Sequence, residues 1–515
     1  MQTKETEFSG LRAIFFPING FELKKFLPMG LMMFFILFNY TIMRDTKDTL
    51  VVGAAGAEAL SLIKLIGTVP GAIAIMLLYS KLSNIFSRQN LFYVTILPFI
   101  IFFGLFAYVI YPYGHMLHPS EATIDGLVAD FPRFKTLFYV YGSWSYAVFY
   151  VLSELWGSVV LSLLFWQFAN EIVRMKEAKR FYSMFGMIAN FSLILSGYTV
   201  HYFSDIREHV APGVDPWGVT LNYLMGAIVL SGIITMGIYR WINVKIMTDK
   251  RYYDPEEVKG PKKVKSKMSL LDSFKLLIRS KHLGFIALLV ICYGISQNVI
   301  EGVWKGQIKE VFTSENEYNA FMGRFSMVTG AITICFMLIG TNVVRVFGWL
   351  VSALLTPFLI LITGMLFFTF VSFKQEVSGW TMAALAMSPT MLAVWLGFGQ
   401  NVLCKATKYS LFDPTKEMSY IPLDQESKVK GKAAVDVVGA RLGKSGGSIV
   451  QQFFLFATGG TLISIAPYLA VAVLASVVVW AFAARGLDKS LQSMQNEAEL
   501  KDAAPQAIQT TATAS

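Results

Sequence analysis

Two short stretches decide the architecture of this chain, and they are near copies of each other: Val69-Pro-Gly-Ala-Ile-Ala-Ile75 and Val328-Thr-Gly-Ala-Ile-Thr-Ile334. Each lies inside an apolar run of about 20 residues, a length that spans the hydrocarbon core of a bilayer as a helix. Only helices and closed barrels satisfy their backbone hydrogen bonds in lipid. A repeat shared by two such runs therefore predicts a membrane protein with two related halves.

The composition agrees with this prediction. Of the 515 residues, 55% are hydrophobic and 15% are charged, which is outside the range of soluble globular domains. The formal net charge of +10 would suggest nucleic-acid binding in a soluble chain. Here much of the positive charge lies between the apolar runs, so it is first a signal of membrane topology, and we expect no nucleic-acid partner.

Twelve apolar runs are long enough to be membrane spans. We place them at 26–46, 59–80, 90–112, 139–168, 179–203, 218–246, 283–305, 318–341, 347–372, 380–404, 432–457 and 461–484. The stretch from Arg240 to Lys281 holds twelve Lys and Arg residues, whereas 203–217 carries only Arg207. If basic loops face the cytoplasm, both termini do too.

The predicted fold is an all-α integral membrane protein of about 12 transmembrane helices with a major-facilitator-like 6+6 pseudo-repeat. In transporters of that kind the substrate site lies near the bilayer midplane, between the halves. The predicted segments are a cytoplasmic N-terminal segment at 1–25, an N-terminal six-helix half at 26–246, a basic cytoplasmic linker at 247–282, a C-terminal six-helix half at 283–485 and a disordered C-terminal tail at 486–515.

Several spans carry cations. A charge near the middle of a span costs roughly 2.5–3.5 kcal/mol on insertion scales, so it suggests a cavity, a partner or a ligand. Arg44 and Lys47 close the first span and share a helix face, and Asp48 can pair with Arg44. Snorkelling to the membrane surface is the alternative for these residues. Arg324 falls within one residue of Lys64 when the repeats are aligned.

Two glutamates also lie within spans. Glu154 has apolar residues for many positions on both sides, and Glu301 lies toward the end of the seventh span. Asn298 lies three residues before Glu301, on the same helix face. Such carboxylates need a partner, and both structural pairing with a Lys or Arg and a direct transport role remain open for each.

The eleventh span contains Arg441 and Lys444, neither of which has a carboxylate three or four residues away. Glycines at 439, 443, 446 and 447 allow a neighbouring helix or a ligand to approach this backbone closely. Gly443-Lys-Ser445 resembles the end of a P-loop, but that motif requires a glycine where Val438 stands. We therefore do not expect a P-loop ATPase.

Cations outnumber carboxylates in these spans, which predicts an anionic ligand, and Lys and Arg bind phosphate well. The five histidines lie in loops or at span ends without a metal-site motif. A membrane enzyme would need a metal or nucleophile constellation, so we expect neither enzymatic activity nor a cofactor. A channel fits poorly with so many cations in the spans.

Three groups of motifs resemble the ATP/ADP translocase (nucleotide transporter) family of plastids and obligate intracellular bacteria. They are Arg44-Asp-Thr-Lys-Asp-Thr-Leu-Val-Val52, Ser153-Glu-Leu-Trp-Gly-Ser158, and Gly431-Lys-Ala-Ala-Val-Asp-Val-Val438 with Leu442-Gly-Lys-Ser-Gly-Gly447. The resemblance implies exchange of external host ATP for internal ADP, with phosphate as a possible co-substrate. It also implies a multi-pass protein in the inner membrane of an intracellular bacterium, or in the plastid inner envelope.

The resemblance further implies that Lys47, Glu154, Glu301 and Lys444 match charged positions that the family needs for transport, although Lys432 competes with Lys444 within its motif. Some family members import several nucleotides by proton symport, and this alternative stays open, with Glu154 or Glu301 as the proton site. We expect a monomer in the lipid bilayer that binds ATP and ADP. The candidate substrate-binding residues are Arg44, Lys47, Glu154, Asn298, Glu301, Arg324, Arg441 and Lys444.

Overall fold

The computed structural model describes residues 16–253, 270–435 and 439–512. All regular secondary structure in these ranges is helical. The chain divides into two compact units. Unit 1 comprises Met1–Lys263 and Ile308–Ile334, and unit 2 comprises Val264–Gln307 and Cys335–Ser515.

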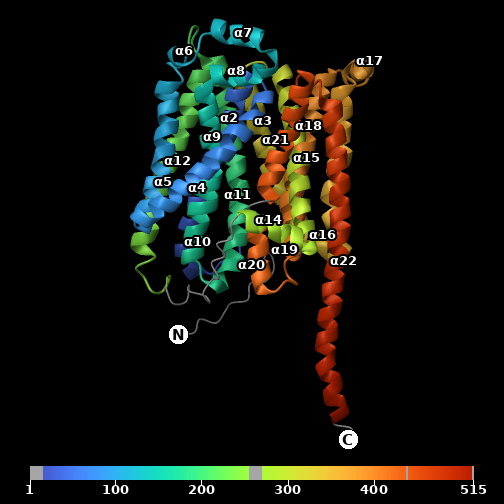
Figure 1. Cartoon of the computed structure of the whole chain (residues 1–515). Helices are drawn as coiled ribbons and strands as arrows, with labels where there is room; N and C mark the ends of the chain where they lie inside the picture. The colour runs from blue at the N-terminus through green and yellow to red at the C-terminus, as the bar shows by residue number, and fades with distance from the viewer. Residues whose placement is uncertain (1–15, 254–269, 436–438, 513–515) are drawn as a thin grey trace. The chain divides into compact units, whose positions relative to one another are not determined.

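Most of unit 1 is built from the N-terminal helices (Figure 1). They are α2 (Leu23–Ala55), α3 (Glu58–Ile63), α4 (Val69–Ile85), α5 (Arg88–Leu105), α6 (Gly114–Leu117), α7 (Glu121–Asp130), α8 (Lys135–Gly142), α9 (Trp144–Trp156), α10 (Trp166–Ile172), α11 (Met175–Ser204) and α12 (Pro216–Lys245). Two π-helical segments join consecutive α-helices into longer spans, η2 (Lys64–Thr68) and η5 (Gly157–Phe165), and a third, η3 (Phe106–Ile110), extends α5. Such segments are rare and often mark functional sites.

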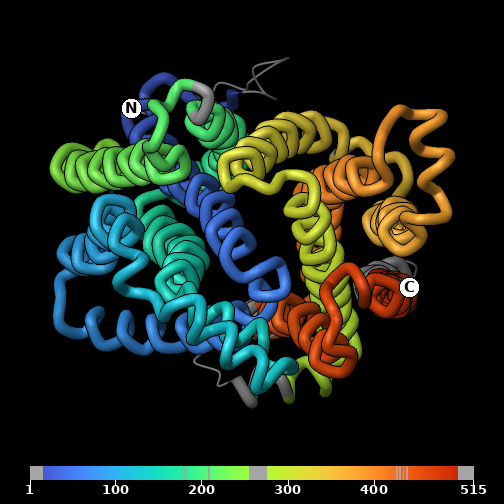
Figure 2. Tube along the Cα trace, turned by 90° about the horizontal axis from the view of Figure 1, so that it is seen from above, coloured from blue at the N-terminus to red at the C-terminus, as the bar shows by residue number. Residues whose placement is uncertain are grey.

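The long helix α2 is central to unit 1. It packs against α9, α11 and α12, which lie around it when unit 1 is viewed along the helices (Figure 2). Its apolar side chains are buried among theirs, as Ile36 and Trp156 illustrate. Pro28 lies near the start of α2, and the helix ends at Gly56, whose φ of 79° lies in the left-handed region that favours glycine. The polar end of α2 is therefore held rigidly inside the unit.

The first part of α16 (Glu315–Ser372) also belongs to unit 1. The amide of Asn316 donates to the backbone carbonyl of Ser204 over 3.0 Å and to the hydroxyl of Thr220 over 2.8 Å. A Cβ atom added at Gly197 on α11 would lie 2.6 Å from the carbonyl oxygen of Gly323. This close approach groups Ile308–Ile334 with unit 1, whereas the sequence assigns the whole eighth span to the second half.

Unit 2 contains the remaining helices. They are α14 (Leu270–Arg279), α15 (Lys281–Val311) up to Gln307, the later part of α16, α17 (Lys374–Leu385), α18 (Pro389–Thr407), the π-helical segment η7 (Lys408–Phe412), α19 (Asp413–Met418), α20 (Gln425–Ala434), α21 (Ala440–Thr458) and α22 (Ala466–Ala512). Gly348, with φ 76° and ψ 179°, breaks α16 into two helices. This break separates the eighth span from the ninth.

Helices α15 and α21 run parallel and approach closely through small residues. In each of three contacts, a Cβ atom added to the glycine would lie 2.7 Å from its partner, and the contacts recur every four residues on both helices. The pairs are Gly294 with Gly443, Gly447 with Asn298, and Gly302 with Gln451. Small residues at this spacing allow membrane helices to pack at short range.

In the described part of the chain, ten helices are long and apolar enough to cross a membrane. A pair bent by 83°, Lys374–Leu385 with Pro389–Met418, would make an eleventh. The predicted span at 432–457 corresponds to parts of α20 and α21, with 436–438 outside the described residues. This predicted span is absent from the ten helices. Its glycines and cations lower its hydropathy, which explains the absence.

The surface and the C-terminus add two observations. Large apolar side chains such as Leu77 on α4 and Val471 on α22 are exposed, as expected for residues that face lipid.

Helix α22 continues to Ala512, where the sequence predicts a disordered tail. Its Ala, Gln, Glu and Leu residues are good helix formers, which accounts for the difference.

Candidate functional site

The ammonium group of Lys47 is the centre of a buried charge cluster in unit 1. Its Nζ lies 2.8 Å from Asp48 Oδ1 and 3.2 Å from Glu154 Oε1 on α9. It also lies 3.8 Å from the ring centroid of Tyr150, one helical turn before Glu154. The Lys47 side chain is only 2% exposed, while that of Glu154 is 18% exposed. Two carboxylates and an aromatic face thus stabilise a cation that would otherwise be costly to bury.

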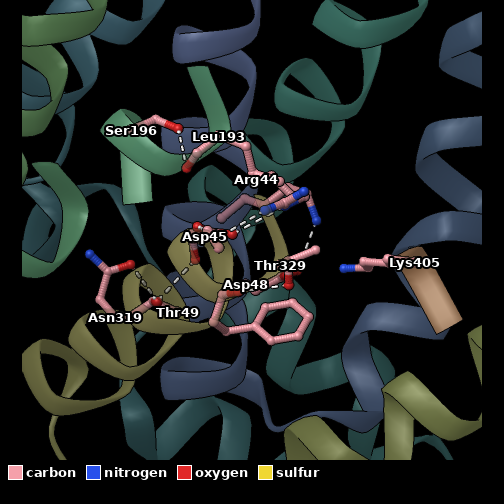
Figure 3. A network of polar contacts seen from close by, with 12 residues as sticks. Arg44, Asp45, Asp48, Thr49, Leu193, Ser196, Asn319, Thr329 and Lys405 are labelled. Carbon is pink, nitrogen blue, oxygen red and sulfur yellow. Dashed lines mark hydrogen bonds and ion pairs between the residues drawn. The ribbon is translucent and has the colours of Figure 1, made fainter. Parts of the chain in front are cut away.

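Beside this cluster, Arg44 and Asp45 join α2 to α16 within unit 1 (Figure 3). Arg44 Nε lies 3.1 Å from Asp45 Oδ1, and Arg44 Nη2 donates to Ser326 Oγ over 2.8 Å. The Ser326 hydroxyl in turn donates to Asp45 Oδ2 over 2.6 Å. These bonds satisfy a carboxylate that is completely buried.

The network continues one turn further along α2. The Thr49 hydroxyl lies 3.0 Å from both the Asp45 carbonyl oxygen and Asn319 Oδ1, and the Asn319 amide donates to Ser204 Oγ over 2.9 Å. Figure 3 shows Thr49 and Asn319 pointing toward each other. The end of α2 is therefore tied directly to α16, and through Asn319 to α11.

Unit 2 has a second charge cluster around Glu301 on α15. Glu301 Oε1 lies 3.1 Å from Lys305 Nζ, one turn along the same helix, and 3.9 Å from Lys405 Nζ on α18. The Lys305 side chain is only 4% exposed, whereas those of Glu301 and Lys405 are 20% and 18% exposed. One carboxylate thus serves two cations, which leaves the trio with a formal charge of one positive unit.

Three more predicted site residues lie along the contact between α15 and α21. Asn298 Nδ2 donates to the carbonyl oxygen of Lys444 over 3.1 Å, and Gln451 Nε2 donates to Asn298 Oδ1 over 3.1 Å. The Lys444 side chain is exposed and that of Arg441 is half-buried. The amide of Asn298 is thus engaged with protein groups.

Arg324 lies apart from the Lys47 contacts described above. Its exposed guanidinium donates from Nε to His201 Nε2 over 3.2 Å, within unit 1. Lys432, the alternative to Lys444, lies 2.6 Å from Glu417. Asp436, four residues after Lys432 and thus on the same helix face, lies outside the described residues.

The sequence does not single out Tyr150, Lys305 or Lys405. The span that contains Lys405 was expected to end at 404, which placed this lysine in a basic loop, but α18 and η7 continue past it. Lys305 lies four residues after Glu301, a spacing at which two charges share a helix face, and this signal could have found Lys305. No cluster of three or more His, Cys, Asp or Glu residues suited to a metal ion occurs among the residues that the structure describes.

Buried lysines held by carboxylates are suited to an anionic ligand that competes with those carboxylates. The sequence matches the TLC ATP/ADP transporter family over residues 1–491. The chain belongs to this family. The expectation drawn from the three motif groups is thereby confirmed.

Individual relatives in the TLC family carry consistent names. The chain is 52% identical over 508 residues to "ADP,ATP carrier protein 1" of Chlamydia muridarum, covering 98% of this chain and 95% of that protein. It is 44% identical over 492 residues to the protein of the same name from Rickettsia bellii, covering 95% and 98%. It is 47% identical over 489 residues to "ADP,ATP carrier protein 2, chloroplastic" of Arabidopsis thaliana, covering 94% and 78%.

Solved structures resemble this TLC family member in fold. The nucleoside transporter NupG gives a TM-score of 0.56 at 10% identity, covering 90% of this chain and 99% of that one. A bacterial homologue of the iron transporter ferroportin in an inward-facing state gives 0.53 at 13% identity, covering 91% and 99%. The prediction of an all-helical, major-facilitator-like membrane protein is confirmed.

Proposed function

We propose that this protein is an antiporter that takes up external ATP in exchange for internal ADP by alternating access. Membership of the TLC ATP/ADP transporter family and the names of the relatives support the substrates. The observation that carries the proposal is Lys47, buried beside Asp48 and Glu154. A cation between two carboxylates has both of them as partners when no ligand is bound, and a phosphate group can take the place of one of them.

In this mechanism Glu154 holds Lys47 while no nucleotide is present. Incoming phosphate groups compete for the ammonium, and the displaced carboxylate turns toward water, which its partial exposure permits. A nucleotide thus changes the energy difference between the two access states, as a ligand that drives a conformational equilibrium must. Within this proposal Arg44, Arg324, Arg441 and Lys444 add positive charge along the nucleotide path, and Glu301 acts in unit 2 as Glu154 does in unit 1.

The setting of this activity is part of the proposal. We place the protein as a monomer in the inner membrane of an intracellular bacterium, with a plastid inner envelope as the alternative, since relatives come from both. Both termini face the cytoplasm, as the basic loops predict. ATP enters from the host side, and phosphate accompanies the ADP that leaves.

Purified protein in liposomes tests the exchange directly. Labelled ATP is supplied outside vesicles that contain ADP, another nucleotide or only buffer, with and without a pH gradient. Exchange predicts uptake that requires internal ADP and responds little to the gradient. Gradient-driven uptake into vesicles without nucleotide would instead establish proton-coupled import.

Co-transport of phosphate is tested by the membrane potential. ATP and ADP differ by about one charge near neutral pH, since each phosphate group contributes on the order of one to two. One-for-one exchange moves net charge and responds to an imposed potential, whereas export of ADP together with phosphate reduces that response. We expect labelled phosphate inside the vesicles to leave in parallel with ADP. Phosphate that stays inside while ADP leaves would exclude its co-transport.

A further inference from the structure

The second charge cluster depends on how α15 and α18 pack inside unit 2. Trp304 Nε1 donates to the carbonyl oxygen of Val394 over 2.9 Å, and Gln297 Nε2 donates to Asn401 Oδ1 over 2.7 Å. Residues later in α15 thus meet residues earlier in α18, so the two helices are antiparallel. These two directional bonds, seven residues apart on each helix, fix the register of the pair, and across it the Lys405 ammonium reaches to 3.9 Å from Glu301 Oε1.

The two lysines around Glu301 differ in their distance from the carboxylate and in their exposure. Lys305 is on the same helix as Glu301, lies closer to it and is almost completely buried. Lys405 comes from the other helix, its Nζ is 3.9 Å from the carboxylate, and its side chain is partly exposed. A bridge of this length is weaker than a close, hydrogen-bonded one. Glu301 can therefore keep Lys305 as a partner while Lys405 exchanges Glu301 for another anion.

The Lys405–Glu301 bridge corresponds to the Lys47–Glu154 bridge of unit 1. Each joins the first long helix of its unit to a helix that continues into a π-helical segment. Glu154 lies three residues before η5, and Lys405 lies three residues before η7. The signs are exchanged, because the lysine is on the first helix in unit 1 and on the later helix in unit 2.

A buried amide next to this bridge uses only its nitrogen. Gln297 lies one turn before Glu301 on α15, is 8% exposed, and uses its Nε2 to bind Asn401, itself one turn before Lys405. In the described part of the chain Gln297 Oε1 has no hydrogen-bond partner. A buried acceptor left in this way is costly, because it has given up its hydrogen bonds to water. A ligand that brings a hydroxyl or amino group beside the cations would remove that cost.

From these observations we propose that Lys405 binds a phosphate group of the transported substrate, and that Glu301 holds Lys405 while the site is empty. This inference rests on the proposed exchange of nucleotides, and it identifies a residue of unit 2 that binds the exchanged substrate. Lys305 keeps Glu301 neutralised in both states. The chemistry that Lys405 recognises is a phosphate anion, which either a nucleotide or inorganic phosphate supplies.

The test compares Lys405→Gln with Lys405→Arg in liposomes that contain ADP. We expect Lys405→Gln to raise the KM for ATP about tenfold or more, since a charge-assisted hydrogen bond to phosphate is lost. Lys405→Arg keeps the charge and should remain close to the wild type. A second readout needs no transport: ATP should raise the Tm of Lys405→Gln less than that of the wild type, because weaker binding stabilises less.

A matched control lies one turn further along the same span. Lys408 is paired with Asp413 over 2.8 Å and lies above the Tyr409 ring, so Lys408→Gln removes a similar cation without touching Glu301. We expect its KM to be unchanged. The double variant Lys405→Gln with Glu301→Gln removes both charges of the bridge, and we expect it to stay impaired.

The outcomes separate this inference from the proposed function. An unchanged KM for ATP together with unchanged efflux of labelled phosphate in Lys405→Gln, or recovery of exchange in the double variant, would show a purely structural bridge. Either result would overturn the inference while exchange by the wild type still stood. Absence of ADP-dependent uptake by the wild type would instead remove the proposed function. If the KM for ATP is raised, Lys405 binds the nucleotide, and if only efflux of labelled phosphate is impaired, it binds inorganic phosphate.

Discussion

The side-chain amide of Asn298 donates a hydrogen bond to the backbone carbonyl of Lys444 over 3.1 Å, and so ties α15 to α21. Gln451, one turn beyond the glycine that meets Asn298, donates to Asn298 from its own amide. These bonds fix the position of Lys444, on α21, along the length of α15. Asn298 therefore positions Lys444, a candidate phosphate-binding residue. Substitutions at Asn298 should thus act through the packing of α15 against α21, unlike the loss of a direct contact with nucleotide.

We expect Asn298→Ala and Gln451→Ala each to lower the free energy of unfolding by about 1 kcal/mol, because interhelical hydrogen bonds in membrane proteins are of that order. The double variant should lose less than the sum, since both changes remove the same contact. Thermal unfolding of the purified protein in detergent measures the loss of stability in each variant. Additive losses would mean that the two amides act independently.

Lys47→Gln should reduce exchange by about a hundredfold or more, because it removes a charge-assisted contact to phosphate and leaves two carboxylates facing each other. Combining Lys47→Gln with Glu154→Gln separates the loss of the phosphate contact from the repulsion between the carboxylates. We expect this pair to restore the Tm but not the exchange rate. Recovery of exchange in the pair would contradict a phosphate-binding role for Lys47.

Tyr150 offers a test of the aromatic face above Lys47. Tyr150→Phe keeps the ring and should leave the KM for ATP within about twofold, whereas Tyr150→Leu removes a cation–π contact of about 0.5–2 kcal/mol. We expect Tyr150→Leu to change the KM by about 2- to 30-fold. Equal effects of the two substitutions would assign the role to the hydroxyl.

The close contact between Gly197 and Gly323 predicts a strong effect of a single methyl group. Gly197→Ala should destabilise unit 1 by more than 1 kcal/mol, on the order of an overpacked core, since the added Cβ atom meets backbone that cannot move aside. Gly237→Ala on α12 is the matched control, because nothing lies within 4 Å of its added Cβ. Tm measurements on both variants should differ clearly, and equal values would refute the rigid contact.

His118 predicts a pH effect outside the membrane spans. Its Nε2 lies 2.7 Å from the Ser145 hydroxyl, and partial burial lowers the pKa of His118 below its ordinary value. The unfolded chain therefore takes up the proton more readily. The stabilising contribution is fully present above the unfolded pKa of about 6.5 and is lost as the pH falls through the folded pKa. Between pH of about 7.5 and 5, the Tm of His118→Gln should fall less than that of the wild type.

Comparison of sequence and structure separates local signals from long-range ones. Hydropathy was sufficient to place α2, α5 and α12, because a span is a local property of about 20 residues. It was not sufficient at Lys405, where the apolar run stops several residues before the helix does. The need of Glu154 for a partner was predictable, but the identity of Lys47 as that partner was not, since it depends on how α2 packs against α9.

The grouping of Ile308–Ile334 with unit 1 was also beyond the sequence. Asn316 and Asn319 look like ordinary polar residues at the start of a span. The sequence around them does not predict that their partner is Ser204. The parallel seam of α15 and α21 was partly visible. The glycines of the eleventh span indicated close packing, but the matching positions on α15 include Asn298, which the sequence suggested for the ligand.

The two Lys–Glu bridges also constrain how the protein is made. Lys47 precedes Glu154, and Glu301 precedes Lys405, by about a hundred residues each, which a ribosome needs on the order of 5–20 s to synthesise. During that interval the earlier charge of each pair has to wait in or near the insertion machinery without its final partner. The first four spans of each half therefore form the smallest segment that contains both members of its bridge, and truncation before the fourth span should expose the nascent chain to quality control.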